Sequence, residues 1–234
     1  MNPGHALVVG ASSAIGSAIT QRLLDRGHAV TGWGRSVERL DEVAAATGGR
    51  IATDRVDVTD DAAVVDALER LDRRLTDPLR VVVWAAGLFD WAPADEADPA
   101  TWSRLLDVNL TAAARLTPRV LSRLRAAPPS TLVYIASGAA HRVYPGNAAY
   151  VASKHGLAAL AAASFLDVRR HGVRVSVVSP GLVAAGAGLW SPLGRTAPEQ
   201  LLTPEDVAGA VEYVVSFPGH GCPVLVELQP LAEG

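Results

Sequence analysis

The stretch that decides the fold is Ala6-Leu7-Val8-Val9-Gly10-Ala11-Ser12-Ser13-Ala14-Ile15-Gly16, where an apolar run ends in a turn with two glycines. Gly10 permits a sharp turn, and Gly16 permits a following helix to approach the strand closely. The N–H groups at such a helix start, with the positive end of the helix dipole, suit a pyrophosphate. The spacing G-x-x-x-A-x-G differs from the common G-x-G-x-x-G, so taken alone it fits an ordinary glycine turn equally well.

Short apolar runs alternate with helical patterns along the rest of the chain. Continuous apolar runs such as Val81-Val82-Val83 indicate strands buried on both faces, as in a parallel sheet. We therefore predict an α/β fold, a doubly wound parallel seven-stranded sheet flanked by helices, forming a single domain over residues 1–234. The expected strands are Ala6–Val9, Ala29–Gly32, Ile51–Val56, Val81–Ala85, Thr131–Ala136, Val173–Ser179 and Val224–Leu228, and the expected helices are Ala14–Arg26, Val37–Ala46, Asp60–Leu75, Pro99–Ala127, Ala149–Arg170 and Pro204–Phe217.

Two segments depart from this regular alternation. Pro118 lies inside the stretch Pro99–Ala127 and is expected to kink or divide that helix, because proline removes a backbone hydrogen bond. The segment at about 182–203 lacks periodicity and is rich in glycine and proline. A loop of that length in a compact domain favours a substrate lid, with a merely irregular connection as the alternative.

Composition excludes several classes of protein. The 234 residues are 49% apolar and 19% charged, which argues against a disordered chain. A net charge of -3 gives no reason to expect nucleic acid or an anionic membrane as partner. No apolar run is long enough to span a membrane, and the N-terminus does not resemble a signal peptide. The single cysteine, Cys222, excludes an internal disulfide and a cysteine-built zinc site, so we expect a cytoplasmic protein without a metal.

The end of the second expected strand indicates which nucleotide would bind. NAD-binding sites carry a carboxylate here for the ribose 2′-hydroxyl. The sequence Gly32-Trp33-Gly34-Arg35-Ser36 has none, and Arg35 instead offers a planar cation suited to a 2′-phosphate. Ser36 adds a hydroxyl. This predicts NADP(H) with NAD(H) as the alternative, unless Arg35 is simply one solvated arginine among 20.

Three further residues predict acid–base chemistry. Tyr150 and Lys154 are four residues apart on an expected helix and therefore share one face. An ammonium beside a phenol favours the phenolate and lowers a pKa that is otherwise near 10. Lys154 is the only lysine in a chain that otherwise uses arginine, which argues against a merely solvated position. Ser137 follows the expected strand Thr131–Ala136, where its hydroxyl is able to bond a substrate carbonyl oxygen.

Taken in order, these motifs resemble the short-chain dehydrogenase/reductase family, whose turn reads T-G-x-x-x-G-x-G and whose active site reads Ser…Tyr-x-x-x-Lys. The resemblance covers Leu7 to Leu228 and implies hydride transfer between a nicotinamide and a carbonyl or alcohol carbon. It implies that Tyr150 exchanges the proton with the substrate oxygen, Ser137 polarises that oxygen, and Lys154 lowers the tyrosine pKa and contacts the nicotinamide ribose. Asn109 matches the family's fourth catalytic position, which holds a relay water.

The resemblance also implies cofactor contacts from Asp57-Val58 to the adenine and from Pro180-Gly181 beside the nicotinamide. Asp57 fits a turn or helix-start residue equally well. Trp84 and Ala185 stand where the family often has an asparagine and a threonine. The expected cofactor-binding residues are Gly10, Ser12, Ser13, Ile15, Gly16, Arg35, Ser36, Asp57, Val58, Ala86, Gly87, Asn109, Tyr150, Lys154, Pro180, Gly181 and Val183.

Aromatic residues near these motifs suggest the substrate. Because they come from separate expected loops, they predict an apolar pocket and so a ketoreductase of an apolar or cyclic ketone. Each of these residues fits a packing role more often than a ligand contact. By resemblance, the expected assembly is a homotetramer or homodimer joined through the helices containing Asn109 and Tyr150. The expected substrate-pocket residues are Phe89, Trp91, His141, Tyr144 and Trp190.

Two other functions remain open on the sequence. The first is a non-catalytic nucleotide-binding sensor or scaffold, which the departures at Trp84 and Ala185 keep in view. The second is an isomerase or dehydratase that uses the same site. The presence of all four expected catalytic residues favours the oxidoreductase.

Overall fold

The computed structural model describes residues 3–91 and 93–231 and confirms the predicted fold. Seven strands form one sheet in the order β3-β2-β1-β4-β5-β6-β7, and every neighbouring pair is parallel. The strand order reverses between β1 and β4, which is where open α/β sheets bind their ligands. The strands are β1 His5–Val9, β2 Ala29–Gly34, β3 Ile51–Arg55, β4 Leu79–Trp84, β5 Ser130–Ile135, β6 Val173–Pro180 and β7 Leu225–Leu228.

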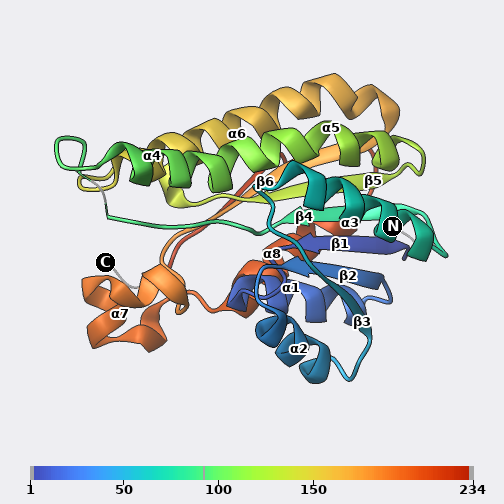
Figure 1. Ribbon diagram of the computed structural model, residues 1–234, viewed down its shortest axis with the longest axis horizontal. Helices are drawn as coiled ribbons and strands as arrows, with labels where there is room; N and C mark the ends of the chain where they lie inside the picture. Colours follow the sequence, from blue (N-terminus) through green and yellow to red (C-terminus); the bar gives the residue numbers. More distant parts are fainter. Residues whose placement is uncertain (1–2, 92, 232–234) are drawn as a thin grey trace.

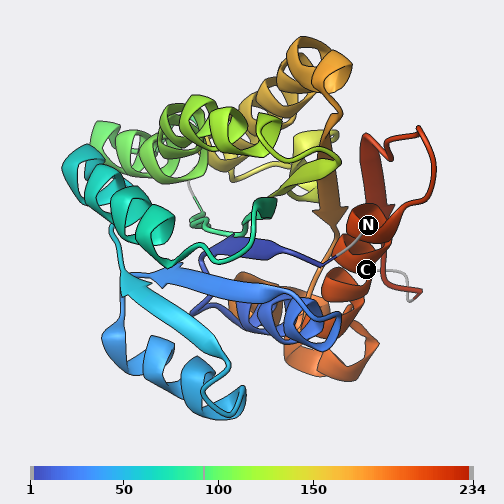
Figure 2. The same ribbon diagram turned by 90° about the vertical axis from the view of Figure 1, so that its right-hand side faces the viewer.

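Helices cover both faces of the sheet, as Figure 1 shows, and the end-on view of Figure 2 shows the twisted strands between the two layers. One apolar core lies under α3 (Asp61–Arg74), α5 (Ala112–Arg125) and α6 (Ala148–Val168). The other lies under α1 (Ala14–Asp25), α2 (Val37–Ala46) and α8 (Pro204–Ser216). Burial on both faces explains why most of β1, β4 and β5 consists of uninterrupted apolar residues.

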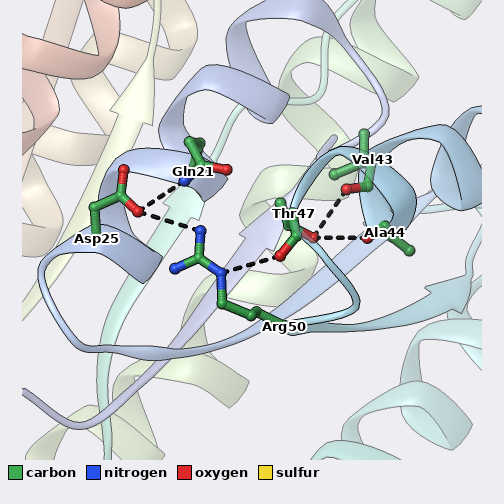
Figure 3. Close-up of polar contacts among 6 residues, drawn as sticks. All are labelled: Gln21, Asp25, Val43, Ala44, Thr47 and Arg50. Carbon is green, nitrogen blue, oxygen red and sulfur yellow. Dashed lines mark hydrogen bonds and ion pairs between the residues drawn. The ribbon is translucent and has the colours of Figure 1, made fainter.

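Side-chain caps begin several of these helices at the residues where the sequence offers a hydroxyl or carboxylate. Ser13 accepts a hydrogen bond from the N–H of Gly16, and Asp60 accepts from the first turn of α3. A further polar cluster ties the end of α1 to the turn after α2 (Figure 3). There Asp25 accepts from Gln21 at 2.7 Å and from Arg50 at 3.2 Å, and Arg50 also donates to the carbonyl of Thr47.

The expected division of the long helix at Pro118 is wrong. Helix α5 continues through Pro118, and the interruption lies earlier, in a π-helical segment over Asp107–Thr111 that joins α4 (Pro99–Leu106) to α5. In that segment the N–H of Ala112 bonds the carbonyl of Asp107. A π-helical insertion widens the turn by one residue and is frequent at functional sites, and this one carries Asn109.

The segment after β6 is more ordered than its composition suggested. It contains 3₁₀ turns at Gly186–Trp190 and Pro198–Gln200 and the short helix α7 (Pro192–Thr196). A parallel bridge between Val183 and Leu202 joins its two ends. In Figure 1, α7 and the beginning of α4 lie at the same end of the molecule. Within residues 3–91 and 93–231, no helix is both long and apolar enough to cross a membrane.

Candidate active site

The glycine turn after β1 leaves backbone donors open at the start of α1. Gly10 has φ +91°, and a β-carbon there would lie 2.6 Å from the nitrogen of Ala86, so glycine is required. A β-carbon at Gly16 would overlap the carbonyl oxygen of Gly10. Among the described residues, the N–H groups of Ser12, Ala14 and Ile15 have no hydrogen-bond partner. Three free donors at a helix N-terminus fit a pyrophosphate.

At the end of β2, Gly34 lies against this turn. A β-carbon at position 34 would be 2.5 Å from Oγ of Ser12, so a side chain there would require Ser12 to move. Arg35 is exposed, and Ser36 begins α2 by accepting from the N–H of Arg39 at 3.3 Å and donating to Glu38 at 2.7 Å. These two predicted residues therefore lie beside the turn, with the Ser36 hydroxyl already engaged.

Arg55 is a residue that the sequence reading missed. The register of β2 with β3 sets it directly opposite Gly34. No local motif marks Arg55, because its proximity to Arg35 depends on the pairing of two strands 21 residues apart in the sequence. Both arginines help to lower the pKa of Asp57, so both cations lie near that carboxylate.

Asp57 occupies a turn, the second of the two roles that its sequence position allowed. Its Oδ1 accepts from the N–H of Thr59 at 3.0 Å and from the Thr59 hydroxyl at 2.7 Å. These hydrogen bonds are the main cause of its lowered pKa. Val58 is partly buried against the core under α3 and α5. The second carboxylate oxygen of Asp57 has no hydrogen bond with a described residue.

Trp84, the last residue of β4, and Gly87, just beyond the strand, have different surroundings. Trp84 is 1% exposed and packs in the core under α5, so it points away from the cofactor turn and does not close it. Gly87, three residues later, lies in the site: a β-carbon there would be 3.3 Å from Nζ of Lys154 and 3.4 Å from Oδ1 of Asn109. Ala86 is partly buried beside it.

Asn109 is fully buried and ties three segments together. Its Oδ1 accepts from the N–H of Leu88 at 2.7 Å, and its Nδ2 donates to the Leu88 carbonyl and to Oγ of Ser153, both at 2.9 Å. Ser153 in turn donates to the carbonyl of Tyr150 at 2.7 Å. The sequence reading missed Ser153, although its place between Tyr150 and Lys154 on one helix turn is a usable signal.

Tyr150, Lys154 and Ser137 come together where α6 crosses the end of β5. Nζ of Lys154 lies 5.8 Å from the centre of the Tyr150 ring and donates to the carbonyl of Ile135 at 3.2 Å. Burial lowers the pKa of Lys154 to about 8. Burial raises the pKa of Tyr150, and a hydrogen bond with Ser137 opposes that shift. Ser137 also accepts from the N–H of Ala139 at 3.2 Å, which fixes its orientation.

Aromatic side chains surround the Tyr150 ring on one side. Phe89 packs edge-on against Tyr150 at 4.9 Å between ring centres and contacts Trp91 in the same way at 5.1 Å. Trp190, from the segment after β6, lies 6.5 Å from Phe89. Trp91 and Trp190 are more than half exposed, which is unusual for packing residues and leaves their faces open.

The two other predicted pocket residues lie beyond Ser137. His141 is hydrogen-bonded at 2.9 Å to Oγ of Ser179, so its ring is tied to the end of β6. The hydroxyl of Tyr144 reaches to 3.4 Å from where a β-carbon of Gly138 would be. The structure therefore brings Phe89, Trp91 and Trp190 into one wall, and it holds His141 at Ser179 and Tyr144 near Gly138.

Beyond Pro180, the end of β6 meets the end of β7. The N–H of Gly181 donates to the Leu228 carbonyl at 2.8 Å, and a β-carbon at Gly181 would lie 2.7 Å from Oε1 of Gln229. Val183 is buried and pairs with Leu202, and Ala185 packs against the core. The sequence reading missed Gln229, because only the pairing of β7 with β6 brings it near the site.

The model of the family described as short chain dehydrogenase matches residues 4–190 of this chain, which is most of its length. The chain belongs to this family. It is an oxidoreductase of the kind that acts on CH–OH and C=O groups. Across residues 3–91 and 93–231, no group of three His, Cys, Asp or Glu side chains is placed to hold a metal ion.

Several named proteins are similar in sequence to this short-chain dehydrogenase. The serine 3-dehydrogenase of Rhizobium radiobacter is 30% identical, with 98% of this chain and 95% of that protein aligned. The NADP-dependent 3-hydroxy acid dehydrogenase YdfG of Salmonella typhimurium is 29% identical over 97% of this chain and 95% of its own length. The glycine betaine reductase ATRR of Emericella nidulans is 31% identical over 97% of this chain, which spans only 19% of that protein.

Among solved structures, a single-residue variant of the actinorhodin polyketide ketoreductase with NADPH is similar to this chain with a TM-score of 0.84. It is 26% identical, with 97% of this chain and 95% of that one aligned.

Proposed function

We propose that this short-chain dehydrogenase is an NADP(H)-dependent ketoreductase that acts on an apolar or cyclic ketone. The observation that carries the proposal is the convergence of Ser137, Tyr150 and Lys154 beside an open aromatic wall. The wall is formed by Phe89, Trp91 and Trp190 and packs on the Tyr150 ring. The hydroxyls supply hydrogen bonds to a carbonyl oxygen, while the wall supplies an apolar surface for the carbon skeleton.

In the proposed mechanism, the nicotinamide, when bound, supplies the hydride. The phenol of Tyr150 has a raised pKa, so it holds its proton at neutral pH and is able to donate it to the oxygen of the carbonyl being reduced. The Ser137 hydroxyl donates a hydrogen bond to the same oxygen. With a pKa of about 8, Lys154 is still mostly protonated at pH 7 and stabilises the phenolate that the transfer leaves.

We propose that Asn109 serves this reaction by holding its surroundings as well as by completing a proton relay. Both N–H donors of its carboxamide are used, on Leu88 and Ser153. A relay water at Asn109 would therefore have to donate its hydrogen bond to an oxygen atom of Asn109, because neither carboxamide N–H is free to bond it.

Preference for NADP(H) rests on the charges near the glycine turn. We propose that Arg35 and Arg55 flank the 2′-phosphate, with Ser12 beneath it at Gly34, a position that carries no acidic side chain. The free N–H groups of the turn would hold the pyrophosphate. Two of the relatives support this choice through their names, which specify NADP or NADPH. Asp57 remains available to the adenine through its second carboxylate oxygen.

The proposed function is tested first by nucleotide binding, followed as thermal unfolding with NADP⁺, NADPH, NAD⁺ or NADH. A nucleotide at 100 times its Kd adds about 2.7 kcal/mol, which at this chain length raises the midpoint by about 5–11 °C. We expect NADP⁺ and NADPH to raise the midpoint more than NAD⁺ and NADH do. In Arg35→Ala, this difference between the two pairs should be lost. The matched control is Arg73→Ala, an exposed arginine of α3 that pairs with Glu69. A larger shift with the non-phosphorylated pair would refute the NADP(H) assignment.

We further propose that residues 182–203 form the substrate lid of one domain that spans the chain. Its ends are joined by the Val183–Leu202 bridge, and it brings Trp190 to the aromatic wall. The half-buried Cys222 has no cysteine partner, which fits the cytoplasmic, reducing compartment that we propose.

We also propose a homodimer or homotetramer joined through α5 and α6. Most of the exposed residues of α6 are apolar, and Leu166 among them is 61% exposed. A helix that is apolar on all sides is ordinarily buried on all sides. The molar mass from light scattering, measured as the protein elutes from a size-exclusion column, checks this assembly. The mass of a monomer would refute it. The exposed small residues of α6 are Ala152, Ala159, Ala162 and Ala163.

A further inference from the structure

We propose that Gln229 and Tyr144 form a polar subsite beside Gly138 that binds a second, neutral oxygen of the substrate, remote from the carbonyl that is reduced. The preferred substrate is then a ketone that also carries an ester, amide, hydroxyl or second ketone group. This inference rests on the proposed function, because it concerns the substrate of that same site.

The two polar groups reach the residue next to Ser137 from different parts of the chain. A β-carbon at Gly138 would lie 3.4 Å from the Tyr144 hydroxyl and 3.7 Å from Nε2 of Gln229. Tyr144 belongs to the loop between β5 and α6, whereas Gln229 directly follows β7. Their convergence is therefore a product of the fold rather than of local sequence.

The position of Gln229 is set by strand pairing. Pro180 pairs with Leu228, and the N–H of Gly181 donates to the Leu228 carbonyl at 2.8 Å. The Gln229 carboxamide then lies between Gly181, on its Oε1 side, and Gly138, on its Nε2 side. A side chain at Gly181 would collide with that carboxamide, since its β-carbon would be 2.7 Å from Oε1.

Both groups are available for a ligand. Among the described residues, neither the Gln229 carboxamide nor the Tyr144 hydroxyl has a hydrogen-bond partner, and both residues are exposed. A phenol O–H and an amide N–H both donate, so together they suit an acceptor oxygen.

The charge around the subsite favours a neutral acceptor over a carboxylate. The adjacent charged side chains are Arg142, from the same loop as Tyr144, and Glu227, two residues before Gln229. They pair with each other at 3.5 Å. Because Arg142 is engaged in this way, its charge is offset at the subsite, which offers hydrogen bonds from neutral groups. A carboxylate, which needs charge compensation when it leaves water, is therefore the poorer ligand.

The experiment uses three ketones with one ring: cyclohexanone, methyl 4-oxocyclohexanecarboxylate and the free 4-oxocyclohexanecarboxylate. We expect the methyl ester to have the highest kcat/KM in the wild-type protein. In Gln229→Leu and in Tyr144→Phe, the ratio of kcat/KM for the ester to that for cyclohexanone should fall about fivefold, the effect of one lost hydrogen bond.

The matched controls are Gln21→Leu and Tyr213→Phe. Gln21 bonds Asp25 on α1 (Figure 3), and Tyr213 is exposed on α8. Neither should change the ratio. A ratio in Gln229→Leu equal to that of the wild type, or a wild-type preference for the free acid over the ester, would overturn the subsite.

A binding measurement separates this proposal from the proposed function. Binding of each ketone to the protein with NADP⁺ is followed by the fluorescence of the exposed tryptophans, of which Trp91 and Trp190 lie on the wall. If no ketone is reduced, the ketoreductase proposal fails. The subsite still stands if the ester binds more weakly to Gln229→Leu than to the wild type, and it fails if the two Kd values agree.

Discussion

Substitution of Asn109 by leucine tests whether this buried asparagine holds the site together. The leucine matches its shape but makes no hydrogen bond. The change removes three bonds, of 2.7, 2.9 and 2.9 Å, and leaves the N–H and carbonyl of Leu88 without their partner. Each bond contributes roughly 0.5–1.5 kcal/mol, and a stranded backbone group costs about 1–3 kcal/mol. Because Leu88 is only partly buried, water recovers some of this, and we expect a loss of about 2–4 kcal/mol.

The assay is urea unfolding, with thermal unfolding as a check. The expected loss lowers the midpoint of thermal unfolding by about 4–16 °C for a chain of this size. Asn147→Leu is the matched control. Asn147 is also buried, but its carboxamide oxygen has no partner among the described residues and its side chain does not cap α6. An Asn109→Leu protein as stable as Asn147→Leu would refute the reasoning.

Three further predictions concern the site. Ketone reduction should decline as pH rises through about 8, because burial lowers the Lys154 pKa to about 8 and the neutral amine no longer stabilises the phenolate; a pH–rate profile that stays flat to pH 10 contradicts this. Ser153→Ala should reduce kcat about fivefold, since it cuts the link from Asn109 to the Tyr150 carbonyl, and Ser153→Thr should restore it in steady-state assays. Gly16→Ala should abolish the thermal shift with NADP⁺ because its β-carbon collides with the Gly10 carbonyl, whereas a retained shift would show that the turn tolerates the methyl group.

Local sequence carries much of this fold. The buried apolar runs and the glycine turn of β1 and α1 predict a parallel sheet, and the helices expected from Ala14 and from Asp60 begin at Ala14 and Asp61 in the structure. The break expected at Pro118 is absent because a proline within a helix is tolerated when packing holds the helix in place, and here α5 packs on the core. The true irregularity, at Asp107–Thr111, contains no proline or glycine that would announce it.

The site divides in the same way. Tyr150 and Lys154 lie on one helix turn, so their spacing alone predicts that they are neighbours. Arg55, Ser153 and Gln229 were not found, and two of them come to the site through strand register, which the local pattern does not encode. Trp84 stands at a motif position where the family often has an asparagine, whereas the alternation of the strand turns its side chain into the core.

The most direct test of the central claim is consumption of NADPH, followed by its absorbance, with a panel of apolar and cyclic ketones. The account predicts that the wild-type protein consumes NADPH in step with alcohol formation. It also predicts that Tyr150→Phe, which keeps the ring against Phe89 but lacks the proton, loses this turnover while still binding NADP⁺. Tyr213→Phe, far along α8, serves as the control. Turnover that survives unchanged in Tyr150→Phe would contradict the account.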